Sequence, residues 1–102
     1  MTTRTSTDAV VATDRPARYG KQLVSHLGRR NGGEWSADAG TGWIDLASAR
    51  ATVTAVDGAL HLHIDGPADE LNRLEDVVGG HLVRFGEKDE LDVTWKRSTT
   101  DG

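Results

Sequence analysis

Four histidines offer this chain its widest choice of chemistry. His26 and His81 each stand at the edge of the apolar stripe of an amphipathic segment. If two helices with these stripes lie side by side, the two imidazoles meet in the groove between them. Histidine in such a groove can bind a metal ion, act as a general base or change charge near neutral pH. The alternative is a partly buried histidine with a structural hydrogen bond.

His61 and His63 form a His-x-His pair in a segment of alternating polarity, so both rings point to one face of a strand. Such pairs bind zinc when a third ligand is near. The neighbours expected across the hairpin are Thr54 and Thr52, which are poor zinc ligands. We expect the pair on the sheet face opposite the helices. The alternative is two polar side chains on an open face, unless a dimer packs there.

Five residues make up the ligand-binding surface that we expect: His26, His81, Tyr19, Lys21 and Trp43. Lys21, with Arg18 and Arg29, supplies positive charge for an anionic ligand. An outward Trp43 would mark a partner or ligand surface. The other register of its strand buries the ring, and the sequence leaves both open. All four histidines remain candidates as metal ligands.

The chain shows no set of side chains with the spacing of a nucleophile, a base and an acid. Glu75 and Asp76 diverge by about 100° on a helix. Ser25 has no triad partners, and the glycine-rich stretches 31–33 and 40–42 lack the lysine of a phosphate-binding loop. We therefore expect no catalytic residue and no cofactor, and the sequence favours a protein that is not an enzyme.

The composition is that of one small domain of 102 residues, with 36% apolar residues and no cysteine. The lack of cysteine excludes disulfides and thiolate metal sites. No apolar run approaches the roughly 18 residues of a membrane span, and the first residues are polar rather than a secretory signal. We expect a cytoplasmic protein that does not bind membranes.

The net charge of −4 is unevenly distributed. Residues 1–30 hold six basic and two acidic side chains, whereas residues 31–102 hold six basic and fourteen acidic ones. The acidic total and the few aromatic residues argue against nucleic-acid binding. The partner is then a small molecule or a protein, and an apolar open sheet face would favour a homodimer.

The elements that must position these residues begin with an amphipathic helix over 68–85. Its apolar positions recur at steps of three and four: Leu71, Leu74, Val78, Leu82 and Phe85. An earlier helix begins near Pro16, runs to about Leu27 and is ended by Gly28. Gly20 inside it predicts close packing against a neighbour.

The strands that these helices cover are read from alternating polarity. We expect them over 8–13, 34–37, 42–46, 49–56, 59–65 and 91–95. Asp57-Gly58 predicts a primed two-residue turn that places Val56 opposite Ala59. The order β-α-β-β-β-β-α-β predicts an α+β fold, an antiparallel sheet of five to six strands with both helices on one face. Residues 1–6 and 97–102 are expected to be flexible tails that flank one domain over 7–96.

Three segments resemble a known family: Arg15–His26, Leu74–Phe85 and Leu91–Trp95. The motifs Arg-Tyr-x-Lys-Gln-Leu and Leu-Glu-Asp-Val-Val-x-x-His-Leu-x-Arg-Phe are similar to those of the bacterial domain-of-unknown-function family 2218. The likeness spans residues 7–96. Members often carry a second histidine and a lysine after the first helix's histidine, where this chain has Arg29 and Arg30.

This resemblance implies no reaction, but it implies an association with siderophore-interacting, flavin-dependent ferric reductases. Two functional hypotheses follow. The first is a non-enzymatic binding or accessory domain for a ligand or protein partner. The second is an iron- or siderophore-associated accessory protein with a histidine-lined groove between its helices.

Overall fold

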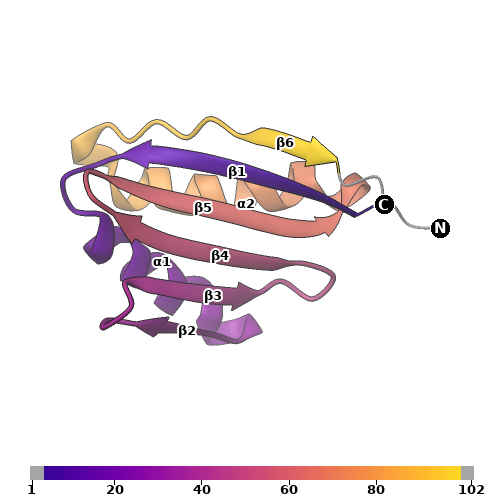
Figure 1. Cartoon of the computed structure of the whole chain (residues 1–102), viewed down its shortest axis with the longest axis horizontal. Coiled ribbons are helices and arrows are strands. Elements are labelled where there is room, and N and C mark those ends of the chain that lie inside the picture. Colours follow the sequence, from indigo (N-terminus) through magenta and orange to yellow (C-terminus); the bar gives the residue numbers. More distant parts are fainter. Residues whose placement is uncertain (1–3, 100–102) are drawn as a thin grey trace.

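The computed structural model describes residues 4–99 as a six-stranded antiparallel sheet with two helices on one face (Figure 1). The strands are β1 (Arg4–Ala12), β2 (Gly33–Ser36), β3 (Thr41–Asp45), β4 (Arg50–Val56), β5 (Ala59–Pro67) and β6 (Lys96–Thr99). The helices are α1 (Pro16–Asn31) and α2 (Leu71–Phe85), with short 3₁₀ turns η1 (Ala68–Glu70) and η2 (Glu87–Asp89). The predicted α+β class is confirmed.

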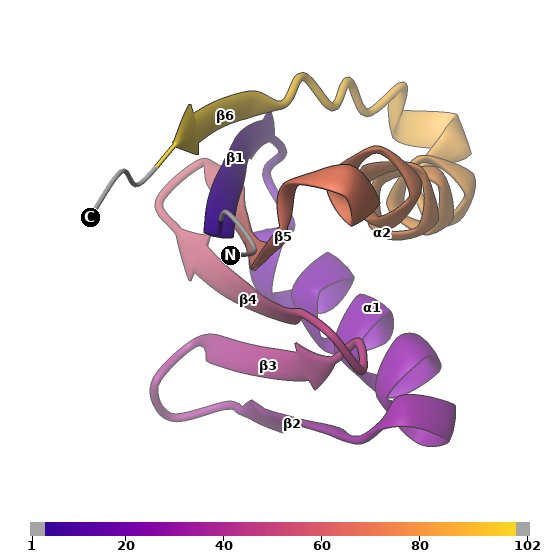
Figure 2. The same ribbon diagram turned by 90° about the vertical axis from the view of Figure 1, so that its right-hand side faces the viewer.

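The sheet order is β2-β3-β4-β5-β1-β6, so the first strand of the chain lies between β5 and β6. Figure 2 shows both helices on the same side of this sheet. Helix α1 packs against β2, β3 and β4, and α2 packs against β5 and β1. Within the described residues, neither helix is long and apolar enough to cross a membrane.

The hairpin of β4 and β5 has the predicted register, with Val56 opposite Ala59 and Thr52 opposite His63. The predicted turn type is wrong. Gly58 has a positive φ of 78°, but Asp57 does not, whereas a primed turn of this kind needs both. The Thr13 N–H donates a hydrogen bond to the Gly58 carbonyl (3.1 Å), so the turn is tied to the loop that precedes α1.

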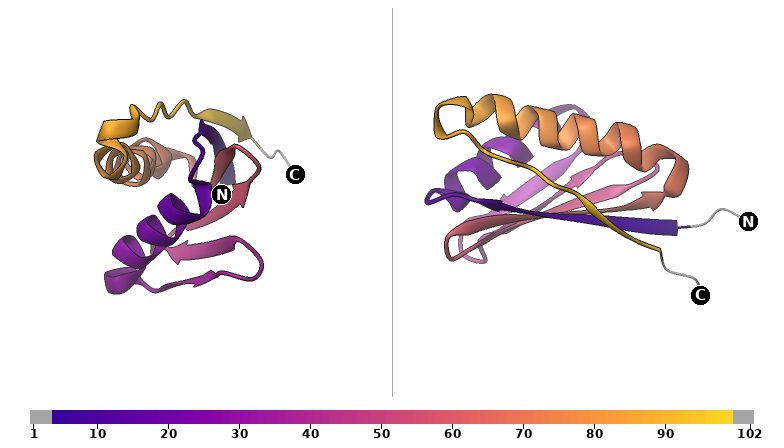
Figure 3. Two further views of the ribbon diagram at one scale, coloured as in Figure 1. Left: turned by 90° about the vertical axis from the view of Figure 1, so that its left-hand side faces the viewer. Right: turned by 90° about the horizontal axis from the view of Figure 1, so that it is seen from above.

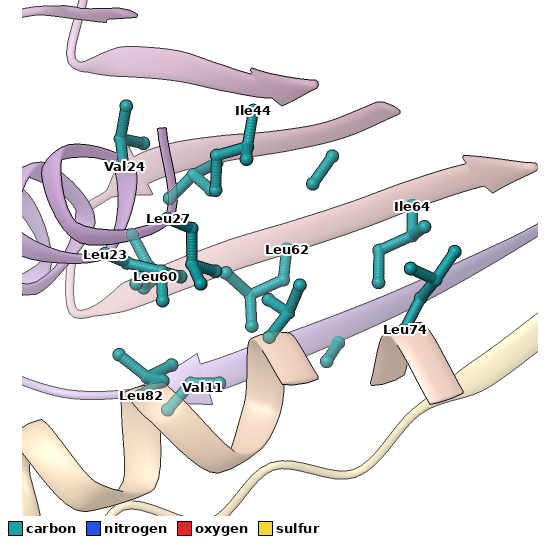
Figure 4. Packing of buried hydrophobic residues seen from close by; sticks show 14 of the residues in the cluster. Val11, Leu23, Val24, Leu27, Ile44, Leu60, Leu62, Ile64, Leu74 and Leu82 are labelled. Atoms are coloured by element: carbon teal, nitrogen blue, oxygen red, sulfur yellow. The ribbon is translucent and has the colours of Figure 1, made fainter. Parts of the chain in front are cut away.

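The core lies between the sheet and the two helices and consists mainly of Leu, Val, Ile and Ala (Figure 4). The apolar stripe predicted for the second helix is buried: Leu71, Leu74, Val78 and Leu82 are at most 2% exposed. Each of these side chains points to the sheet because positions three and four apart share a helix face. Because this stripe faces the sheet, the remaining faces of α2 are left for solvent and for contact with α1.

Helix α1 is longer than predicted and continues past Gly28 to Asn31. Gly28 serves close packing rather than termination: a Cβ added there would lie 3.1 Å from Gly33 Cα. The helix ends instead at Gly32, whose φ of 100° suits glycine and whose N–H donates to the Gly28 carbonyl. The extension adds a turn that carries Arg29. The second predicted helix also differs at its start, since its first turn is the 3₁₀ turn η1.

Both predicted tails are wrong at their inner ends. Residues 4–6 belong to β1, which pairs with β5 along its whole length, and residues 97–99 belong to β6. Residues 1–3 and 100–102 lie outside the described part of the chain.

The strand predicted over 91–95 is not a strand; this segment runs back along α2 before the chain joins the sheet (Figure 3). Its alternation is real, since Leu91 is buried and Val93 and Trp95 are half-buried against the core. Gly79 makes room for it, because a Cβ there would lie 3.2 Å from Trp95 Nε1. Alternating burial thus arises here from packing on a helix, without strand pairing.

Candidate functional site: the groove between the two helices

The two helices run antiparallel along the sheet. Tyr19, near the start of α1, lies beside Gly86 at the end of α2, and His26, about two turns later, lies beside His81. The ring centroids of His26 and His81 are 5.0 Å apart, and the ring planes are tilted by 44°. The structure thus brings together the two histidines that, from the sequence, meet only if the two helices lie side by side.

Phe85 braces this pair from the next turn of α2. Its ring packs edge-on against His26, with centroids 5.4 Å apart, and lies 6.3 Å from the ring of His81. An aromatic contact of this kind restricts the rotation of an exposed imidazole. The rings of His26 and His81 are therefore presented to the groove in a defined arrangement.

The hydrogen bond of His81 defines its tautomer. His81 Nδ1 lies 2.6 Å from the carbonyl oxygen of Val77, one helical turn earlier. A carbonyl can only accept, so Nδ1 carries the proton. In the neutral ring the lone pair is then on Nε2. Among the described side chains, none forms a hydrogen bond with the ring of His26.

The groove beside this pair has a volume of about 560 Å³. Its described lining residues are His26, Leu27, Arg29, Asn31 and His81, and none of these carries a carboxylate. The side-chain amide of Asn31 already makes one hydrogen bond, because its Nδ2 donates to the Leu27 carbonyl (3.0 Å). The polar groups that face the groove are therefore cationic or neutral, on a protein whose net charge is −4.

A second hollow of about 550 Å³ lies further along the same two helices, beyond Phe85. Its described lining holds four basic and two acidic side chains: Arg15, Arg18, Arg84, Lys88, Glu87 and Asp89. Because Phe85 lines this hollow and also packs on His26, the two hollows are neighbours. Positive charge thus extends along the face between the helices.

Tyr19 has a structural contact that the sequence did not reveal. Its hydroxyl donates a hydrogen bond to the Asp89 carboxylate, which fastens η2 to α1. That hydrogen bond, with burial and the negative charge of Asp89, holds the pKa of Tyr19 above its usual value. The ring is buried, so Tyr19 shapes the wall of the second hollow and offers little surface to a ligand.

Lys21 and Trp43 lie away from the histidine pair. Lys21 is exposed on α1 and is absent from the described linings of both hollows. Trp43 is half-buried on the sheet face opposite the helices, because Ile44 points into the core. Arg50 lies over its ring, 4.6 Å from the centroid, and the ring lines a separate hollow of about 260 Å³.

His61 and His63 lie on the open face of the sheet, as predicted, and cannot join the other pair. The sequence missed their partner, Asp8 of β1, which lies opposite His63. His61 Nε2 and His63 Nδ1 lie 3.1 and 2.7 Å from the same oxygen, Asp8 Oδ1, and both donate to it. Asp8 already lay in the predicted strand, but its neighbour β5 depends on the strand order, which the sequence did not predict. Over residues 4–99, no group of three or more His, Asp or Glu side chains is placed to hold a metal ion.

The sequence predicted only some of the basic side chains around the two hollows. Arg29 was expected to attract an anion, but the contributions of Asn31, Arg84 and Lys88 depend on how the two helix ends are placed. The adjacent acids Glu75 and Asp76 diverge as predicted. Glu75 faces Thr7 and Arg97, whereas Asp76 is exposed.

Residues 8–96 match a bacterial family described as an uncharacterized protein conserved in bacteria, DUF2218. The chain belongs to this family. Both helices and their histidines lie within the matched region, which confirms the resemblance read from the two helical motifs. Membership in DUF2218 assigns no activity.

The fold is similar to a solved one, the NMR structure of PA4090 from Pseudomonas aeruginosa. The TM-score is 0.69 at 25% sequence identity, and the likeness covers 92% of this chain and 95% of the other. No curated protein matches the chain.

Proposed function

We propose that this member of DUF2218 is a non-enzymatic binding module whose groove between α1 and α2 takes a small anionic ligand. One observation carries the proposal: the described polar groups of the 560 Å³ groove are two imidazoles, a guanidinium and an amide. The volume is within the range of about 300–1,000 Å³ typical of small-molecule sites. A carboxylate or phosphate ligand would find cationic hydrogen-bond donors there and no like charge.

The same observation argues against turnover. A hydrolytic or proton-transfer site needs a nucleophile or a base together with an oriented partner. The described lining of the groove offers no hydroxyl or carboxylate nucleophile, and no described carboxylate forms a hydrogen bond with the ring of His26 or His81. The groove can therefore recognise a charged ligand without acting on it. An activity abolished by both His26→Ala and His81→Ala, with the fold intact, would contradict this proposal.

The second candidate function is an iron-linked accessory role, in which the ligand is a ferric siderophore. The positive charge along the helix pair favours it, since many ferric chelates are anions. Ferric iron prefers oxygen donors, and its coordination is already filled in such a chelate. The groove would hold the chelate by charge through Arg29 and not through an imidazole–iron bond.

The test is titration of the full chain, stripped of metal and freed of chelator, with citrate and with inorganic phosphate at low ionic strength. Binding is followed by backbone amide NMR shifts. We expect shifts along 26–31 and 77–85, and a loss of affinity of about tenfold in Arg29→Gln, since hydrogen bonds to charged groups contribute about 1.5–3 kcal/mol.

The matched control is Arg73→Gln. Arg73 is an exposed arginine of α2 that pairs with Glu70 outside the groove, so its variant removes the same charge elsewhere. Equal losses in Arg29→Gln and Arg73→Gln would show that only net charge matters and would refute a defined site. A ferric chelate that shifts the same amides, with no response to citrate or phosphate, would favour the iron-linked function.

A further inference from the structure

The state of His81 is the first observation that points to a more specific ligand. Its Nδ1–H is held by the Val77 carbonyl, which directs the lone pair of the neutral ring to Nε2. Histidines that bind metals almost always donate their other ring N–H to a carbonyl, a carboxylate or water. His81 therefore has the hydrogen bond that a metal-binding histidine requires before any metal arrives.

The distance to His26 is the second observation. Two imidazoles that bind one tetrahedral metal ion through nitrogens about 2.0–2.1 Å from it have ring centroids roughly 5 Å apart. The centroids of His26 and His81 are 5.0 Å apart. The rings are tilted by 44° and are not stacked in parallel, and no described side chain competes for the nitrogens of His26 by hydrogen bonding.

The chemistry of the lining sets which metal complex fits. Imidazole nitrogens suit zinc, copper and nickel, whereas oxygen donors suit magnesium and calcium. Two protein ligands leave coordination positions open, because no third His, Asp or Glu joins the pair within residues 4–99. Arg29 in the same groove disfavours a bare dication and favours one that carries an anion.

We propose that His26 and His81 bind a divalent transition-metal ion of the zinc, copper or nickel class, and that the anionic ligand of the groove completes its coordination beside Arg29. This rests on the proposed function and names the class of ligand more closely. Metal and anion then bind with positive coupling, because each compensates the charge that opposes the other.

The pair on the other side of the sheet supplies the matched control. His61 Nε2 and His63 Nδ1 both donate to Asp8, which leaves His61 Nδ1 and His63 Nε2 without a hydrogen bond to that carboxylate. This pair is therefore the competing candidate that the experiment must separate from the groove. The chain thus contains two candidate histidine pairs, and the groove pair is the one that lies beside Arg29. A variant that removes His61 and His63 changes the histidine count without touching the groove.

The experiment titrates the full chain, without a histidine tag and stripped of metal, with Zn²⁺ by calorimetry and with Co²⁺ by visible absorption. We expect one equivalent to bind to the native chain and to a His61→Gln, His63→Gln double variant. His26→Gln and His81→Gln should each weaken binding at least tenfold. Thermal unfolding of each variant shows that the fold remains.

Three outcomes overturn the metal site: no binding of Zn²⁺ or Co²⁺ to the native chain, binding that depends on His61 and His63, or binding unchanged in both His26→Gln and His81→Gln. Phosphate titration of the chain stripped of metal and freed of chelator separates this failure from failure of the anion site. Phosphate binding without Zn²⁺ binding retains the proposed function and refutes the metal, and the reverse result retains the metal and refutes the anion.

Discussion

Glu75 of α2 and Arg97 of β6 form a two-point ion pair, with Arg97 Nε 3.1 Å from Glu75 Oε2 and Nη2 3.0 Å from Oε1. The same carboxylate accepts a hydrogen bond from the hydroxyl of Thr7 in β1 (2.7 Å). One acidic side chain therefore joins a helix to the two strands at the edge of the sheet. It holds the last strand at the place where the sequence predicts a tail.

Low pH should decrease the free energy of unfolding by protonating the Glu75 carboxylate. Burial raises the pKa of Glu75, but the hydrogen bonds from Arg97 and Thr7 outweigh it, and the net pKa is lowered. A lowered folded-state pKa gives stability that is complete above the unfolded value, about 4.5, and is lost as the pH falls through the folded value. Glu75→Gln should lower the free energy of unfolding at pH 7 by about 1–2 kcal/mol and flatten its decline in acid.

Urea unfolding followed by tryptophan fluorescence at pH 7 and at steps below pH 5 measures this effect. Asp76→Asn is the control, because Asp76 is the exposed neighbour on the same helix. It should change stability by no more than about 0.5 kcal/mol. Equal effects of the two substitutions would show that the ion pair contributes nothing beyond net charge.

Tyr19 should lose its phenolic proton at a higher pH than a free tyrosine does. The hydrogen bond to Asp89 holds its pKa above the usual value of about 10. The stability that this contact contributes is complete below the unfolded value and is lost as the pH rises through the folded one. Because the chain has one tyrosine, the rise in phenolate absorbance reports Tyr19 alone. We expect its midpoint to fall in Asp89→Asn, and an unchanged midpoint would place Asp89 away from the hydroxyl in solution.

Two helical glycines should respond oppositely to alanine. A Cβ at Gly20 would lie 2.8 Å from Trp35 Cη2 and 3.1 Å from Leu60 Cδ1, whereas one at Gly80 meets nothing within 4 Å. Gly80→Ala should stabilise by about 0.5–1 kcal/mol through helix propensity. Gly20→Ala should lose more than this to overpacking, a net cost of about 1 kcal/mol. Thermal unfolding of both variants under one condition measures the contrast, and a stabilising Gly20→Ala would contradict the close packing of α1 on β2.

Substitution of Asp8 should affect only the histidine pair on the open sheet face, His61 and His63. Asp8→Ala removes the acceptor shared by His61 and His63 and should cost about 0.5 kcal/mol, the scale of an exposed cross-strand pair. Imidazole nitrogen NMR should show both of these rings changing while the rings of His26 and His81 do not. Ser6→Ala, on the same strand face, is the control. A response of all four histidines would mean that the substitution disturbs the whole sheet.

The sequence was most informative where one short segment carries the whole signal. The register of the β4–β5 hairpin followed from turn length and alternation, since a slip by one residue would move every apolar side chain of the strand to the solvent face. The buried stripe of α2 followed from its spacing for the same reason. The close packing of Gly20 followed from the cost of glycine in a helix.

The errors arose where a local pattern has two tertiary causes. Alternation over 91–95 was taken for a strand, but it comes from packing beside Gly79 on α2. Gly28 was taken for a helix end, but its missing side chain lets β2 approach α1. Arg4 to Ser6 were taken for a tail because their polar side chains carry no apolar signal, and only their pairing with β5 orders them.

The candidate site divides in the same way. The sequence by itself determined that His26 and His81 lie at the edges of two apolar helix stripes, and that His61 and His63 share one strand face, because helical and strand periods are local. Only the tertiary structure decided that the first pair meets at 5.0 Å beside Arg29, and that Asp8 engages the second. Both outcomes depend on strand order and on the direction in which α2 returns across the sheet. These are set by contacts between residues far apart in the sequence, such as Asp8 with His63 and His26 with His81.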